Sequence, residues 1–126
     1  MASWTNDELN KIGNAEELDI ASMCANGTLR KPVTIWVVRV GDELYVRAYK
    51  GRNGPWFRGT QTQHEGHVRS GGIDKDVTFV DAIDPNVIDQ VDAAYRSKYR
   101  RYSAQIVDPM LTAEARAATI KLVPRK

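Results

Sequence analysis

The segment YKGRNGPWFRGTQTQ, residues 49–63, gathers side chains that suit a phosphorylated aromatic ligand. An arginine can hydrogen-bond a phosphate through two N–H groups at once, and a tryptophan offers a flat face to a ring. The glycines let a ligand approach the backbone, and Pro55 suits the first turn of a helix, where free N–H groups attract anions. The pattern predicts a cofactor site. The alternative is a loop in which Trp56 closes one end of the fold and the arginines face water.

Two further groups of residues could do chemistry, but each has a simpler explanation. His64 and His67 have the spacing of two metal ligands on one helix face, yet the chain has no third histidine, so solvated loop histidines are favoured. Asp74 and Asp76 alternate with apolar residues and therefore fall on a solvent face, where nothing is expected to raise a carboxyl pKa. We therefore expect no metal site and no catalytic set of side chains.

The densest basic run is YRSKYRRY, residues 95–102, in which tyrosines alternate with cations. Such a pattern can bind nucleic acid. Cations at a helix C-terminus also complement the helix dipole, and these tyrosines fall at helical spacing on the packing face. The net charge of the chain is only +2, so we do not expect nucleic acid as a partner.

Length and composition limit the remaining possibilities. The 126 residues fit a single domain, residues 1–126, and the apolar fraction of 42% is enough for a core. One cysteine excludes an internal disulfide, and no apolar run approaches the roughly 20 residues that a membrane helix needs. The start of the sequence lacks a secretory signal pattern. We expect a cytoplasmic protein without a membrane partner.

Period-two patterns and turn signals predict the elements that position the site. The run PVTIWVVRV, residues 32–40, predicts one strand that is buried on both faces. GD and GG turns predict two hairpins, and Asp84 with Pro85 predicts the start of the longest helix. Further predictions are a helix over residues 6–12, a strand within ELDIASMC, helices near residues 56–64 and in TAEARAAT, and a last strand in TIKLV. Six short antiparallel strands favour a closed barrel, which removes exposed strand edges.

The stretch from about Arg30 to Phe79, and more weakly TIKLVP, resembles a family of small bacterial proteins of about this length. That family is similar to deazaflavin-dependent nitroreductases and to pyridoxamine-phosphate-oxidase-like flavoproteins. The resemblance implies a six-stranded antiparallel split β-barrel with peripheral helices, of the FMN-binding type. It also implies a homodimer with FMN, FAD or deazaflavin at the subunit interface. In the nitroreductases the Pro-Trp-aromatic motif runs on to an asparagine, whereas here Phe57 is followed by Arg58.

The same resemblance implies which residues of this chain would bind the cofactor. One side of the cofactor would be bound by Arg30, Lys31, Thr34 and Trp36. A second side would be bound by Arg47, Ala48, Tyr49 and Lys50. The phosphate end would be bound by Trp56, Arg58 and Gly59.

Three hypotheses for the function follow. The first is a flavin- or deazaflavin-dependent oxidoreductase similar to the nitroreductases, in which the cofactor carries the hydride chemistry and the protein supplies binding and electrostatics. The second is a non-enzymatic member of the same fold that binds a ligand for storage, sensing or protection. The third is a module that binds a partner through the tyrosine-rich helix. The apolar face of VIDQVDAAY adds a reason to expect a homodimer.

Overall fold

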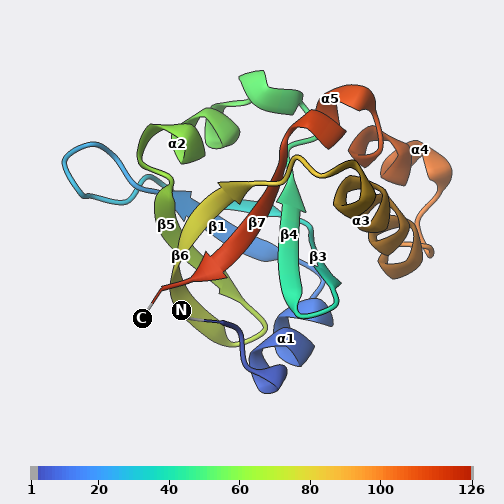
Figure 1. Ribbon diagram of the computed structural model, residues 1–126, viewed down its shortest axis with the longest axis horizontal. Helices are drawn as coiled ribbons and strands as arrows, with labels where there is room; N and C mark the ends of the chain where they lie inside the picture. Colours follow the sequence, from blue (N-terminus) through green and yellow to red (C-terminus); the bar gives the residue numbers. More distant parts are fainter. Residues whose placement is uncertain (1–2, 126) are drawn as a thin grey trace.

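A computed structural model describes residues 3–125 of the chain (Figure 1). One antiparallel sheet curls into a barrel, with helices at both ends and along one side. No helix in this part of the chain has the length and apolar character needed to cross a membrane. The strands are β1 (Leu18–Ser22), β2 (Val33–Ile35), β3 (Val37–Val40), β4 (Glu43–Arg47), β5 (Glu65–Ser70), β6 (Ile73–Asp81) and β7 (Thr119–Pro124). The helices are α1 (Asn6–Gly13), α2 (Pro55–Gln63), α3 (Pro85–Lys98), α4 (Ala104–Val107) and α5 (Ala113–Ala117), with 3-10 turns η1 (Gly51–Asn53) and η2 (Asp108–Met110).

The connection between β2 and β3 closes the barrel. The strand order is β2-β1-β5-β6-β7-β4-β3, so these two strands lie at opposite ends of the sheet. Only Trp36 separates them in the sequence. Because one continuous segment supplies both ends, the sheet must curl back on itself. The predicted antiparallel split barrel is therefore confirmed, with seven strands instead of six.

The prediction of one doubly buried strand over residues 32–40 was wrong. The chain changes partner at Trp36: Val33 pairs with Ile20 of β1, whereas Val37 pairs with Val46 of β4. The β2 segment is largely exposed, with Val33 at 39% of its full exposure, and only β3 begins in the core. A β-branched run favours an extended backbone, but it carries no information on which strand will pair with it.

The two predicted hairpins are confirmed, and glycine conformation explains both. Gly41 has φ of 60° in the β3–β4 turn. Gly71 and Gly72 have φ of 58° and 84° in the β5–β6 turn. A two-residue turn that matches the twist of its strands needs such positive angles.

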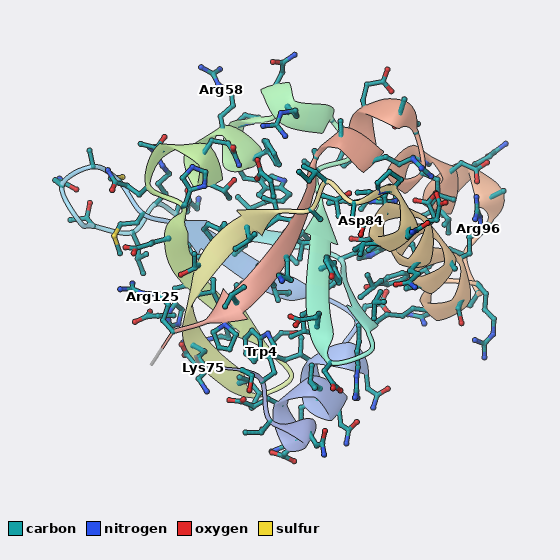
Figure 2. All side chains as sticks on the ribbon, in the orientation of Figure 1. Trp4, Arg58, Lys75, Asp84, Arg96 and Arg125 are labelled. Atoms are coloured by element: carbon teal, nitrogen blue, oxygen red, sulfur yellow. The ribbon has the colours of Figure 1, made fainter. Side chains whose placement is uncertain are left out.

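The main core fills the barrel interior. Leu44 and Val46 of β4 meet Phe79 of β6 and Leu122 of β7 there, and all four are essentially inaccessible to solvent. The Trp4 indole packs into the same core, and its N–H donates to the Leu122 carbonyl at 2.8 Å (Figure 2). The N-terminal segment and α1 thereby cover one end of the barrel (Figure 1).

A second core lies between the outer face of β3–β4 and α3. Tyr45 and Arg47 alternate with the interior residues of β4 and point toward this helix. Val91, Tyr95 and Tyr99 supply the helix side of the contact. The predicted apolar face of this helix is thus used inside the chain.

Candidate functional site

A cavity of about 690 Å³ opens where β2, the end of β4, the start of α2 and the α4–η2 segment meet. This volume is typical of small-molecule sites. The lining is mostly apolar and aromatic, and the described residues that form it include cations but no carboxylate. They are Val33, Thr34, Ile35, Trp36, Arg47, Tyr49, Lys50, Pro55, Trp56, Gln105, Ile106, Pro109 and Met110.

A smaller and more polar cavity of about 330 Å³ shares Pro55 with the first one. Its other lining residues are Arg30, Arg58, Gly59 and Thr62. Arg58 is exposed and extends from α2 away from the barrel (Figure 2). The cavity therefore presents two guanidinium groups beside the first turns of α2.

The backbone at the start of α2 adds to this anion-binding character. The N-cap residue, Gly54, has no side chain that could accept hydrogen bonds from the first turn of the helix. The free N–H groups of that turn are left for water or for an anion. A Cβ on Gly59 would lie 2.3 Å from Ser22 Oγ and 3.2 Å from Arg30 Nε. The glycine thus allows Arg30 to approach the helix.

Most of the residues implied by the resemblance come together around these two cavities. Lys31 is exposed, Ala48 is buried, and neither lines either of these two cavities. The larger cavity is lined by Thr34, Trp36, Arg47, Tyr49, Lys50 and Trp56. The smaller cavity is lined by Arg30, Arg58 and Gly59.

Arg47 differs from the other predicted residues because its guanidinium is bound by the protein itself. Its side chain is fully buried and forms an ion pair with Asp92 of α3. It also donates to Thr119 Oγ1 at 2.8 Å and to the carbonyls of Met110 and Ile88, each at 3.0 Å. These four partners occupy most of its five N–H donors. In this geometry Arg47 holds β4, α3 and η2 together behind the cavity wall.

Trp36 forms the base of an aromatic stack. Its ring lies parallel to that of Tyr99, with centroids 3.8 Å apart and planes 6° apart. Tyr102 stacks on Trp36 at 5.3 Å. The Tyr99 hydroxyl donates to the Glu16 carbonyl at 2.8 Å, and Lys98 Nζ donates to the Val37 carbonyl at 2.6 Å. Burial lowers the pKa of Lys98 to about 8.

The two histidines have different surroundings. His64 is exposed and ends α2 in a left-handed conformation. His67 lies on β5 and contacts two carboxylates of β6, with Nδ1 2.7 Å from Asp76 and Nε2 against Asp74. Burial acts to lower the pKa of His67, but the hydrogen bonds to Asp76 and Asp74 outweigh it and raise that pKa. This cluster was not predicted from the sequence, although residues 67 and 76 face each other in the predicted hairpin.

The wall contributed by α4 and η2 was also missed. Gln105, Ile106, Pro109 and Met110 lie in the larger cavity, but their segment follows the longest helix without a strong periodic pattern. Pro109 was the only local signal, since proline marks a turn or a helix start. The position of the α4–η2 segment against β2 is set by tertiary packing.

The sequence matches, over residues 8–122, a protein family described as "Uncharacterized protein conserved in bacteria (DUF2255)". The chain belongs to this family. No curated protein matches the sequence. Solved structures with the same fold are similar to the chain at low sequence identity.

The heme storage protein HutZ of Vibrio cholerae has a TM-score of 0.69 at 13% identity, over 100% of this chain and 92% of that one. A Listeria innocua protein provisionally assigned as a pyridoxamine 5'-phosphate oxidase has a TM-score of 0.67 at 12% identity, over 96% and 93%. The FAD and heme binding protein of Mycobacterium smegmatis has a TM-score of 0.53 at 18% identity, over 94% and 64%. These similarities place the DUF2255 chain among the split barrels.

Proposed function

We propose that this DUF2255 protein binds a flavin or a deazaflavin across the two cavities. The ring system would be held by residues of the larger cavity, among them Trp36 and Trp56. The phosphate would be held by Arg30 and Arg58 of the smaller cavity. The observation that carries the proposal is that an aromatic cavity and a dibasic one are neighbours that share Pro55 in their linings, because an aromatic ring joined to a phosphate needs both environments side by side.

The chain's own residues would bind and orient such a cofactor. Lys50, an exposed lining residue, adds a positive charge, and Thr34 and Gln105 supply hydrogen-bonding groups for a ring edge. Arg47 acts indirectly, by holding the wall in place. When bound, a flavin or deazaflavin supplies hydride chemistry without an acid-base set from the protein. We propose an oxidoreductase role on this ground, with FMN, FAD and deazaflavin as the candidate cofactors.

Heme is the second ligand to consider, because two of the structural neighbours are described as heme proteins. Heme iron is commonly bound by His, Cys, Met or Tyr. Of these types, the described lining residues include only Tyr49 and Met110, and Met110 is 7% exposed. The absence of a histidine from this lining favours the flavin class.

We also propose that two copies of the chain associate at the mouth of the larger cavity. Three apolar or aromatic side chains at this mouth are exposed: Val33 at 39%, Tyr49 at 56% and Ile106 at 51%. Isolated exposed apolar residues are common, but three around one cavity form a patch suited to an interface. A second copy would cover the exposed edge of a bound ring.

Arg58→Ala tests the phosphate site. An exposed arginine contributes little to stability, whereas a hydrogen bond to a charged phosphate is worth roughly 1.5–3 kcal/mol. We therefore expect the melting temperature to stay nearly unchanged and the affinity for FMN to fall by about one to two decades. Riboflavin lacks the phosphate, so its affinity should change little. Fluorescence titrations with both ligands measure the difference.

Arg96→Ala is the matched control, because Arg96 is also exposed but lies on α3, outside both cavities (Figure 2). Equal losses of FMN and riboflavin affinity in Arg58→Ala would argue against a phosphate at this position. If the wild-type protein binds neither flavins nor deazaflavin, the proposed function is wrong.

An oxidoreductase should also speed the reoxidation of its reduced cofactor by an added nitroaromatic acceptor, whereas a binding protein should not.

A further inference from the structure

The aromatic stack on Trp36 connects the larger cavity to the protein surface. Trp36 lines the cavity, and Tyr102 lies on it with 5.3 Å between the ring centroids. Tyr102 is half-buried, and the exposed Arg101 guanidinium lies over its ring, 4.8 Å from the centroid, so this end of the stack is at the surface of the molecule. Electrons move rapidly between aromatic rings at such short separations. The stack is therefore a continuous path for one electron between the cavity and the surface.

The hydroxyl of Tyr102 has a partner that can accept a proton. It donates to a carboxylate oxygen of Glu16, and the Arg101 guanidinium holds the same carboxylate. The hydrogen bonds from Tyr102 and Arg101 lower the pKa of Glu16, so this carboxylate is ionised at neutral pH. The Glu16 side chain is 37% exposed and can pass a proton to water. A tyrosine loses an electron readily only when its phenolic proton can leave at the same time.

Tyr99 lacks such a partner, although it stacks more closely on Trp36. Its hydroxyl donates to a backbone carbonyl, that of Glu16, and a backbone carbonyl is not a base at neutral pH. The Tyr99 side chain is fully buried, and burial raises its pKa. Tyr99 therefore supports the stack, and Tyr102 is the residue at which an electron and a proton can separate.

We propose that Trp36, Tyr102 and Glu16 form a route that carries an oxidising equivalent out of the cavity and so protects the site. The route rests on the proposed function, since a photoexcited flavin is the class of one-electron oxidant that the cavity would hold. The oxidant gains one electron from Trp36. The Trp36 radical cation then gains one electron from Tyr102, while the phenolic proton passes to Glu16. A thiol at the surface returns one hydrogen atom to Tyr102 and becomes a thiyl radical, and Glu16 releases its proton to water.

Pulse radiolysis of the protein without added flavin tests the route directly. Azide radicals remove one electron from tryptophan, and transient absorption then follows tryptophan radical loss and tyrosine radical gain. We expect a fast first-order phase that is independent of protein concentration. Trp36→Phe should remove this phase and leave the signals of the other two tryptophans. Tyr102→Phe, which keeps the ring and loses only the hydroxyl, should slow the phase by about tenfold or more.

Glu16→Gln distinguishes a role of Glu16 as proton acceptor from a role as a structural contact, because the amide still accepts a hydrogen bond but is not a base. It should also slow the phase, and it should reduce the deuterium isotope effect of the wild-type protein. Tyr45→Phe is the matched control, since Tyr45 is buried in the same core cluster but has no part in the route. An unchanged fast phase in Tyr102→Phe, or in Trp36→Phe, would overturn the proposal. Because the experiment uses no flavin, a failed flavin titration overturns only the proposed function.

Discussion

At the scale of single residues, two arginines of the same predicted site take opposite roles. Arg47 is inaccessible to solvent and has four protein partners, whereas Arg58 is exposed beside the smaller cavity. Both were placed in the site by resemblance to a family pattern, which identifies a residue type at a position. The partner that distinguishes them, Asp92, lies 45 residues from Arg47. A single acidic residue on a helix gives no sign that it is buried against an arginine.

Arg47→Ala should cost about 3–5 kcal/mol of unfolding free energy, because it leaves the Asp92 carboxylate buried with less compensation. Chemical denaturation compared with wild type and with Arg58→Ala measures the difference. The double variant Arg47→Met, Asp92→Leu should recover much of the loss, since it removes both charges and keeps apolar volume. Arg116, which also pairs with Asp92, would retain Asp89 as its partner. Equal stability of Arg47→Ala and Arg58→Ala would contradict a structural role for Arg47.

His67 should make stability depend on pH. Its pKa is raised in the folded protein by the β6 carboxylates, so the folded state binds a proton more tightly than the unfolded chain. The stabilisation is then fully present below the unfolded histidine pKa, about 6.5, and is lost as pH rises through the higher folded value. Urea denaturation should therefore give a lower unfolding free energy above this window than below it. His67→Gln should flatten this dependence, and a dependence that persists in this variant would assign it to another group.

At the scale of elements, local signals predicted the helix starts and the tight turns correctly. Thr5 Oγ1 accepts from the Glu8 N–H at 3.1 Å, and the Glu8 carboxylate accepts from the Thr5 N–H at 2.9 Å, which forms a capping box at the start of the predicted helix. Such contacts join residues that are three apart. The exchange of partners at Trp36 and the position of α4 involve residues far apart in the chain, and no pattern within a short window specifies them.

Helix capping can be tested with two hydroxyl residues that hold the same position. Thr5→Ala should cost about 1 kcal/mol of unfolding free energy, because it removes a side-chain acceptor from the first turn of α1. Ser103 is the N-cap of α4 but forms no capping hydrogen bond through its side chain. Ser103→Ala should therefore cost no more than a few tenths of a kcal/mol, as for other surface changes. Thermal denaturation of both variants gives the comparison, and equal costs would show that the capping contact of Thr5 is not formed.

At the scale of the whole molecule, the closed sheet explains why the site exists at all. Closure brings the end of β2 beside the end of β4, and α2 and the α4–η2 segment complete the cavity from two other parts of the chain. The barrel class followed from hairpin signals and alternation, because these depend on neighbouring residues. The shape of the cavity could not follow, since it depends on four segments that meet only in the folded chain. Gln105 and Met110 were missed for this reason.

The proposed homodimer is tested at this scale by placing a charge at the cavity mouth. Ile106 is 51% exposed, so Ile106→Asp should leave the folded chain nearly as stable as before. If the mouth is the interface, the variant buries an unpaired carboxylate on association, and this penalty should shift the protein to monomer in sedimentation equilibrium. Ile83→Asp is the control, because Ile83 is 85% exposed but does not line the cavity. If the wild-type protein sediments as a monomer throughout the micromolar range, the mouth is not a stable interface. If the dimer survives Ile106→Asp but not Ile83→Asp, the interface lies beside the start of α3 instead.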